Sequence, residues 1–189
     1  MNYRFFDGAL PDCAITVQSS GHRKVSMGWC TTKEVWGDKE GKIKLYEINI
    51  SAEFLDDDFF ETMDTLMHEM VHLYNIVHDV KDCSRNNTYH NKHFKNRAIK
   101  SGFFYPDSNP DKRYGWSFAK LSPETKEIIR SLAIDQTVFS ISRKGAMFFD
   151  SLSSDSKNEV PEVAADPKSY KWVCPSCVVI VRSKKRILI

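Results

Sequence analysis

The sequence predicts an α+β fold in which a small sheet packs on one long helix. Residues 14–18, 24–29 and 45–50 are β-branched or alternating and are separated by Gly, Ser and charged residues, as strands are. From residue 56 the apolar spacing changes to that of a helix, which we expect to run to about Asp79. Three strands before the first long helix favour a sheet that covers one face of that helix.

Length and composition favour one globular domain with an appendage. The chain has 189 residues, of which 41% are hydrophobic, and a formal net charge of +2, which excludes the strongly basic class of nucleic-acid binders. No stretch approaches the roughly 18 apolar residues of a membrane span, and the first residues lack the apolar core of an export signal. Five cysteines, an odd number, do not resemble a disulfide framework. We therefore expect a cytoplasmic protein without a membrane partner.

The long helix has a predicted start and two predicted faces. Asp56, Asp57 and Asp58 supply an N-cap and place negative charge in the first turn, where the helix dipole favours it. A step of about 100° per residue divides the side chains between a core face and an opposite polar stripe. The core face holds Phe59, Phe60, Met63, Leu66, Met67, Met70, Val71, Tyr74 and Val77, and the stripe holds Glu61, Asp64, Thr65, His68, His72 and Asn75.

Three further elements and a polar segment follow. A loop at 81–88 leads to a helix at 91–100, which Gly102 ends. Another helix is predicted at 123–132, with Ser122 as N-cap, and residues 137–141 resemble a strand. Residues 151–168 are rich in Ser and contain two prolines, which is typical of a linker. The predicted organisation is a domain at 1–150, a linker at 151–168 and a separate tail at 169–189.

The strongest motif is His68-Glu69-Met70-Val71-His72, a match to HExxH. On a helix this spacing places both imidazoles on one face, one turn apart, where two ring nitrogens can bind the same Zn²⁺. Glu69 lies about 100° round the helix, out of the ligand stripe but within reach of a water that it can deprotonate. Two solvated histidines are the alternative, which is disfavoured because five of the six histidines lie between residues 68 and 93.

Two histidines compete to be the third ligand. His78 has the spacing of the longer motif HExxHxxGxxH, but Asn75 replaces the glycine at which that motif turns. If the helix continues past Asn75, His78 points about 280° away from His68. The alternative is His90, at the start of the next helix, with His93 as its neighbour.

Several segments together resemble the SprT-like zinc metallopeptidase domain, whose relatives include the Spartan DNA-protein crosslink protease. They are Asn2, Phe5-Phe6-Asp7-Gly8, Leu10-Pro11, Gly28-Trp29, HEMVHLYN from His68 and YHNKHF from Tyr89. The resemblance implies a zincin-like fold, Zn²⁺ as cofactor, His68, His72 and His90 as ligands, and Glu69 as the catalytic residue. The glycine that usually follows the third histidine is Asn91 in this chain, which leaves the local turn to be explained.

The tail from residue 169 has two features of its own. Cys174 and Cys177 resemble the first half of a zinc ribbon, a closed site that needs four ligands, and the second CxxC is expected beyond Ile189. Basic residues without any acid surround the aromatic side chains Tyr170 and Trp172, a composition that suits phosphates and unpaired bases. The basic residues are Lys168, Lys171, Arg182, Lys184, Lys185 and Arg186. DNA is therefore an expected partner of the tail.

The predicted function is zinc-dependent hydrolysis of peptide bonds by a metalloendopeptidase, in protein or peptide substrates. The resemblance extends this prediction to proteins that are bound or crosslinked to DNA. The rival is a non-catalytic, zinc-stabilised module that binds nucleic acid. Glu69 distinguishes the two functions, because a purely structural zinc site has no use for a carboxylate beside an open coordination position.

Overall fold

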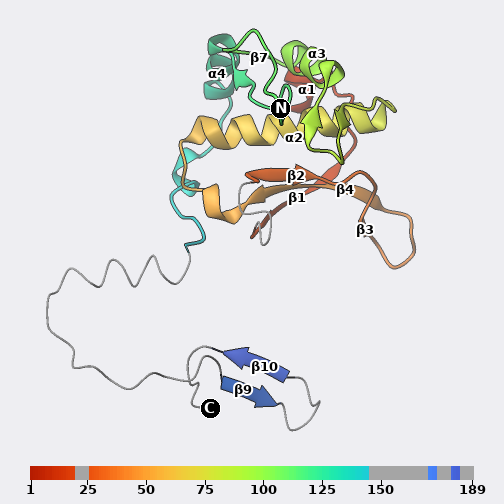
Figure 1. Ribbon diagram of the computed structural model, residues 1–189, viewed down its shortest axis with the longest axis vertical. Coiled ribbons are helices and arrows are strands. Elements are labelled where there is room, and N and C mark those ends of the chain that lie inside the picture. The colour runs from red at the N-terminus through yellow and green to blue at the C-terminus, as the bar shows by residue number, and fades with distance from the viewer. Residues whose placement is uncertain (20–25, 145–169, 174–179, 184–189) are drawn as a thin grey trace, which may run out of the picture. The chain divides into compact units, whose positions relative to one another are not determined.

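Helix α2 (Phe59–Val77) is the centre of the fold, with the sheet on one side and the other helices on the opposite side (Figure 1). The computed structural model describes residues 1–19, 26–144, 170–173 and 180–183. The predicted α+β class and the packing of a small sheet on the helix are both confirmed. The helix begins where the acidic run predicts, since the Asp58 side chain accepts a hydrogen bond from the backbone N–H of Phe60.

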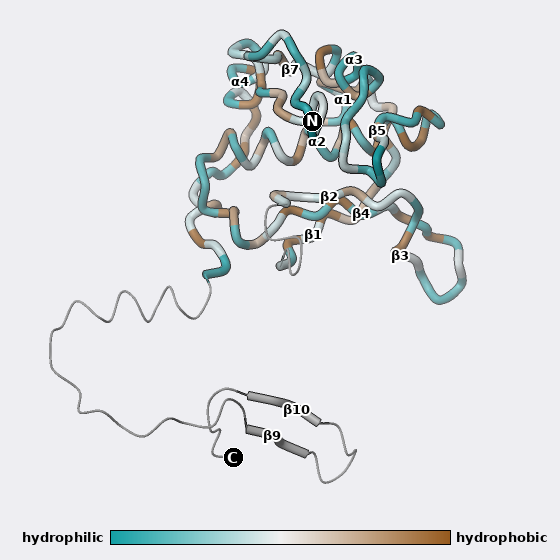
Figure 2. The backbone as a smooth tube through the Cα atoms, in the orientation of Figure 1, coloured by the Kyte–Doolittle hydropathy of each residue, from teal (hydrophilic) through white to brown (hydrophobic). Residues whose placement is uncertain are grey.

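The sheet is mixed and has β4 at its centre. Strand β4 (Lys44–Ser51) pairs in parallel with β1 (Cys13–Gln18) and antiparallel with β2 (Gly28–Cys30) and β3 (Trp36–Gly37). The loop between β3 and β4 is mostly hydrophilic, although it contains the exposed Ile43 (Figure 2). The predicted first and third strands are confirmed.

The predicted second strand, at 24–29, is displaced in the structure. Within the described residues, pairing begins at Gly28. The Ser26 hydroxyl instead donates to the Gly28 carbonyl at 2.5 Å, so the chain bends locally before it enters the sheet.

The remaining helices are confirmed by their caps. Asn91 caps α3 (Lys92–Lys100) and Ser122 caps α4 (Pro123–Arg130), in each case through a side-chain oxygen that accepts backbone N–H groups. Short elements that the sequence did not predict complete the fold. These are α1 (Asn2–Phe5), η1 (Ala52–Phe54), β5 (Cys83–Ser84), β6 (Tyr89–His90), β7 (Phe103–Phe104) and β8 (Lys120–Leu121).

The predicted strand at 137–141 is wrong. Residues Gln136–Val138 form a 3-10 turn, η2, and residues 139–144 belong to no strand. The Asp135 carboxylate accepts from both the backbone N–H and the hydroxyl of Thr137, which caps the turn and competes with an extended conformation. The β-branched composition of this segment is outweighed by the local cap.

Most of the polar stripe predicted on α2 is shielded from solvent, although the side chain of Glu61 is 41% exposed. Asp64, Thr65 and Asn75 are buried. The sheet covers one side of the helix and α3 with its neighbouring loops covers another, so polar side chains of α2 find partners inside the protein (Figure 1). Asp64, for example, accepts the backbone N–H of Leu121 at 2.7 Å.

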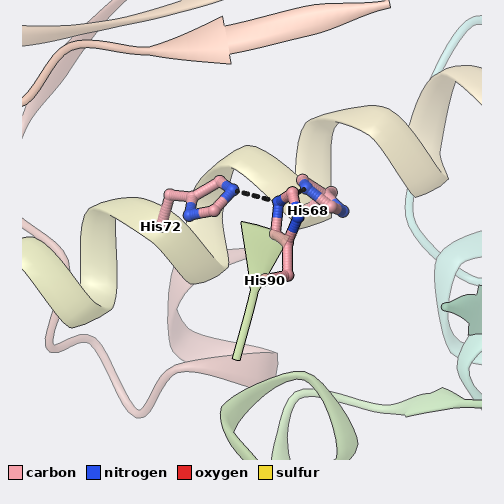
Figure 3. Close-up of side chains that lie close together, drawn as sticks. All are labelled: His68, His72 and His90. Atoms are coloured by element: carbon pink, nitrogen blue, oxygen red, sulfur yellow. Dashed lines mark hydrogen bonds between the residues drawn. The ribbon is translucent and has the colours of Figure 1, made fainter. Parts of the chain in front are cut away.

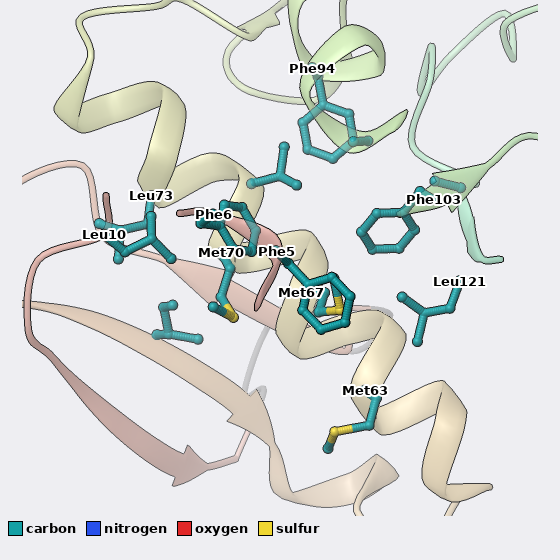
Figure 4. Packing of buried hydrophobic residues seen from close by; sticks show 14 of the residues in the cluster. Phe5, Phe6, Leu10, Met63, Met67, Met70, Leu73, Phe94, Phe103 and Leu121 are labelled. Atoms are coloured by element: carbon teal, nitrogen blue, oxygen red, sulfur yellow. The ribbon is translucent and has the colours of Figure 1, made fainter. Parts of the chain in front are cut away.

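Apolar side chains of α2 join those of the other elements in one core cluster (Figure 4). Two polar contacts hold the first residues of the chain on this core. The Asn2 side chain pairs with both backbone groups of Leu10, and the Arg97 guanidinium donates to the Phe5 carbonyl at 2.9 Å. The fully buried members of the core are Phe6, Ile48, Met67, Val71, Leu73, Phe94, Ala98, Leu121 and Ile129.

The chain divides into two compact units, Met1–Gly145 and Ala146–Ile189. In the second unit β9 (Tyr170–Val173) pairs antiparallel with β10 (Ile180–Ser183). The predicted linker at 151–168 lies outside the described residues, as do Cys174 and Cys177. None of the described helices is long and apolar enough to cross a membrane.

Candidate metal centre

Three imidazole rings from two separate segments of the chain converge on one point. Helix α2 presents His68 and His72 one turn apart, and β6 brings His90 opposite them (Figure 3). Nε2 of His90 lies 3.1 Å from Nε2 of His68 and 3.1 Å from Nε2 of His72. A nitrogen of each ring lies within 4.8 Å of the others, so the three side chains could hold one metal ion.

His90 is fixed on both sides of its backbone. Strand β6 pairs with β5, where Cys83 is the partner of His90. On the other side, the backbone N–H of His90 donates to the Tyr114 carbonyl, and the N–H of Trp116 donates to the His90 carbonyl, each at 3.0 Å. Gly115 lies between these two contacts with a φ of +66°, and a Cβ there would lie 2.1 Å from the His90 oxygen. Only glycine fits this close approach.

Asn91 explains how the chain manages without the expected glycine after the third histidine. Its backbone is extended, with a φ of −91°, so no left-handed conformation is required. Its side chain caps α3 by accepting from the N–H groups of His93 and Phe94. The departure from the family pattern therefore serves the start of the helix.

The hydrogen bonds of the ring Nδ1 atoms direct the Nε2 lone pairs inward. His90 Nδ1 lies 3.2 Å from the Tyr114 carbonyl, which can only accept, so Nδ1 carries the proton. His72 Nδ1 lies 2.8 Å from the Asp82 carboxylate. Burial raises the pKa of Asp82, but hydrogen bonds from His72 and Asn75 outweigh it and the pKa is lowered, so this carboxylate is also an acceptor.

The donor set fits a metal ion. With protons on both Nδ1 atoms, the neutral rings turn two Nε2 lone pairs toward each other across 3.1 Å, an arrangement that either a metal cation or a proton on His72 would stabilise. Tetrahedral zinc, with Zn–N distances of about 2.0–2.1 Å, would hold its nitrogens about 3.3 Å apart. The observed separations agree with that value.

Burial keeps His68 and His90 in the neutral form that binds a metal, whereas for His72 the hydrogen bond to Asp82 outweighs burial and raises the pKa. The Phe94 ring packs against all three imidazoles, with centroid distances of 4.6, 4.7 and 4.6 Å to His68, His72 and His90. Burial, together with the neighbouring histidines, lowers the pKa of His68 and lowers that of His90 to about 4. Neutral imidazoles are the ones that coordinate metals.

Glu69 follows the first histidine and lies on the side of α2 that faces the sheet. A Cβ added to Gly28 of β2 would lie 3.3 Å from Cγ of Glu69, so this strand and the glutamate are in direct contact. Burial, reinforced by Asp82 and opposed by His72, raises the pKa of Glu69 to about 7.

The two other candidate histidines lie elsewhere. His78 ends α2, where its Nδ1 donates to the Tyr74 carbonyl at 2.7 Å and its ring stacks on that of Tyr74. His93 lies on the exposed part of α3. Of the two candidates for the third position, His90 and not His78 lies in the group with His68 and His72 that could hold a metal ion.

Sequence reasoning missed the residues that surround the three rings. Asp82 contacts His72, and together with Cys83 these residues form a second group whose possible ligand atoms lie within 4.8 Å of one another. The loop that carries Asp82 follows no period, so neither spacing nor composition singles it out. Tyr114 also lies outside any helix or strand, whereas Phe94 lies on α3 and belongs to the YHNKHF segment, whose spacing does not reveal its contact with the three rings.

Of the six basic residues predicted to contact nucleic acid, two lie in the described part of the tail. Lys171 and Arg182 are partners in the register of the β9–β10 pair. Lys168, Lys184, Lys185 and Arg186 lie outside the described residues.

Comparison with known families agrees with this geometry. Residues 1–113 match the SprT-like family, a range that includes all three histidines of the cluster and Glu69. No curated protein and no solved structure matches the chain. Because the match spans more than half of the sequence, the chain belongs to the SprT-like family, whose members are generally metallopeptidase-type domains.

Proposed function

We propose that this protein is a zinc metalloendopeptidase of the HExxH type, with His68, His72 and His90 as zinc ligands and Glu69 as the general base. The observation that carries the proposal is the position of Glu69 next to His68 on α2, the helix that supplies two of the three clustered nitrogens. Three histidines leave one tetrahedral position open, which is the composition of a catalytic zinc site and not of a closed structural one.

The chemistry divides between the ion and the chain. Zinc bound there would polarise the substrate carbonyl and make a water more acidic. Glu69 accepts a proton from the water while the water oxygen attacks the carbonyl carbon. Glu69 then gives the proton to the departing amine as the C–N bond breaks, so that one water is consumed for each peptide bond cleaved. The hydrogen bonds on His72 and His90 hold the ligand rings fixed during both transfers.

Strand β2 offers a place for an extended substrate. Two backbone hydrogen bonds determine which backbone groups of β2 face β4. The N–H of Ser51 donates to the Met27 carbonyl, and the N–H of Thr31 donates to the Glu47 carbonyl. The backbone groups of Gly28 and Cys30 therefore point away from β4, and no strand of the described residues pairs with that edge. A peptide added there would run past Glu69, which contacts Gly28.

The substrates that we propose are proteins bound or crosslinked to DNA, with the tail as the DNA contact. This proposal rests on the basic and aromatic composition of residues 168–189 together with the family resemblance. The cysteine pair of the tail is proposed to contribute to a second, structural zinc site. The rival function remains a zinc-stabilised module that binds DNA without cleaving anything.

One experiment separates the two functions. The full chain, loaded with zinc, is incubated with a protein crosslinked to single-stranded DNA and with the same protein free, and fragments are identified by mass spectrometry. Cleavage by the wild type and none by Glu69→Gln supports the peptidase. DNA binding without cleavage by either protein would favour the rival.

A further inference from the structure

We propose that Asp82 is a positioning residue that assembles the three-histidine site before any metal arrives. This inference rests on the proposed metal site and adds a residue to it from the loop between α2 and β6. Asp82 does not face the point where the Nε2 atoms meet. It acts through the far nitrogen of His72.

Two side chains donate hydrogen bonds to the Asp82 carboxylate, which is buried. Oδ2 of Asp82 accepts from His72 Nδ1 at 2.8 Å and from Asn75 Nδ2 at 3.0 Å. The side chains of His72 and Asp82 are only 15% and 11% exposed. The second donor, Asn75, holds the carboxylate in the orientation that sets the ring of His72.

The backbone beside Asp82 also holds the segment that contains His90, the third histidine. Its carbonyl accepts the N–H of Asn91 at 2.9 Å, directly after His90. The next residue, Cys83, is the strand partner of His90. Asp82 therefore connects the side chain of one predicted ligand with the backbone that carries another.

The same contacts oppose a second metal in the group formed by His72, Asp82 and Cys83. These residues lie within the spacing of a metal site. In the structure, however, the His72 imidazole and the Asn75 amide both donate hydrogen bonds to the carboxylate. A metal there would remove all these hydrogen bonds from a buried carboxylate, so the group works as a hydrogen-bond network that supports one site.

The test uses the full chain and two measurements that do not depend on turnover. Zinc affinity is measured by competition with a chromophoric chelator, and the tautomer of His72 is read from imidazole ¹⁵N shifts in the zinc-free protein. Asp82→Ala is expected to weaken zinc binding about 10-fold to 100-fold and to release His72 from the Nδ1–H tautomer. The tail is identical in all variants, so its contribution cancels.

Asp64→Ala is the matched control. Asp64 is as buried as Asp82, at 8% exposure for each residue, and its carboxylate also accepts hydrogen bonds, but from Leu121 and Lys120. This variant should lose stability and keep both zinc affinity and the His72 tautomer. If it weakened zinc binding as much as Asp82→Ala does, Asp82 would have only a general structural role and the inference would be wrong.

Two further variants keep the proposal testable if Asp82→Ala does not fold. Asp82→Asn preserves volume and can keep an oxygen toward His72 and Asn75, which both bond Oδ2, but it removes the negative charge behind the His72 ring, so about a 10-fold loss of affinity is expected. Wild-type affinity and an unchanged tautomer in this variant would overturn the proposal. Cys83→Ser keeps a donor and should keep the full zinc content, whereas loss of one zinc ion would establish a second metal at Cys83.

The role of Asp82 can be rejected while the proposed function stands, and the measurements distinguish the two failures. If the wild type binds zinc and cleaves substrate while Asp82→Asn binds zinc equally well, only the role of Asp82 is rejected. If the wild type binds no zinc, the proposed function fails, and the tautomer of His72 in the zinc-free protein still reports whether Asp82 sets the ring.

Discussion

Nε2 of His72 and Nε2 of His90 face each other across 3.1 Å, while each ring uses its Nδ1 in a hydrogen bond on the far side. His72 lies on the central helix α2 and His90 on the two-residue strand β6, so α2 and β6 meet at this contact. Two lone pairs that face each other repel, and the site therefore favours an occupant that carries positive charge.

Zinc should accordingly stabilise the fold. At a free zinc concentration of 100 times Kd, a ligand that binds only the native state adds about 2.7 kcal/mol to the free energy of unfolding. Thermal denaturation of the metal-loaded and chelator-treated protein should show a clear drop in Tm on metal removal. His90→Ala should have a low Tm in both conditions.

His78→Ala is the control for the metal experiment. His78 stacks on Tyr74 at the end of α2 and is not part of the cluster. Its removal should leave the response of Tm to zinc unchanged. A zinc response lost in His78→Ala and retained in His90→Ala would reverse the assignment of the third ligand.

Glu69→Gln should keep the fold and the metal but lose about 10²-fold to 10⁴-fold in hydrolysis rate. The amide has nearly the same shape as the carboxylate and cannot accept the proton of the attacking water. Zinc content by elemental analysis and the cleavage rate of a protein substrate give the two readouts.

Glu61→Gln makes the same chemical change two turns earlier on α2. Glu61 is partly exposed and pairs with Lys120, away from the histidines. This control should cleave substrate at the wild-type rate. Equal rates for Glu69→Gln and the wild type would exclude Glu69 as the general base.

Gly28→Ala should disturb the contact between β2 and α2. The added Cβ would lie 2.8 Å from the Asn49 carbonyl oxygen, 2.8 Å from the Thr65 methyl and 3.3 Å from Cγ of Glu69. Overpacking of this kind lowers the free energy of unfolding by about 1–3 kcal/mol. The added methyl group would also displace the side chain of Glu69, the proposed base. Urea denaturation should show the loss of stability, and the cleavage rate should fall with it.

A second substitution tests the cause of that loss. Thr65→Ser removes the methyl group and keeps the hydroxyl that donates to the Glu61 carbonyl. The double variant should recover part of the stability of Gly28→Ala, because the clash with Asn49 remains. A double variant as unstable as the sum of the two single changes would show that Thr65 is not where the added methyl group strains the packing.

The sequence predicted those features that depend on neighbours along the chain. The i, i+4 spacing placed His68 and His72 together, and short-range caps at Asp58 and Ser122 marked where helices begin. Local signals misled at residues 137–141, where the β-branched composition indicated a strand but Asp135 caps a turn. A cap that acts over two residues is harder to recognise than a periodic pattern.

The features that could not be predicted depend on long-range pairing. His90 was chosen over His78 by family resemblance, because spacing alone does not reveal that Tyr114 and Trp116 hold β6 against the helix. Asp82 follows His72 by ten residues in an irregular loop, and only the folded chain brings its carboxylate to Nδ1. Such contacts leave no periodic trace in the sequence.

Removal of residues 168–189 should leave the first unit folded and weaken DNA binding. The first compact unit, Met1–Gly145, contains the whole core cluster and all three clustered histidines, so its Tm and its zinc response should not change. The removed segment carries six Lys and Arg residues, namely Lys168, Lys171, Arg182, Lys184, Lys185 and Arg186. Their loss should reduce both the affinity for DNA and its dependence on salt, because fewer counterions are released on binding.

Fluorescence anisotropy with single-stranded and duplex oligonucleotides at two salt concentrations measures both quantities. Tyr170 and Trp172 can stack on unpaired bases, so the single strand should lose more affinity than the duplex. Equal affinity of the full and shortened chains would show that the tail does not bind DNA and would leave the proposed DNA-bound substrates without support from this segment.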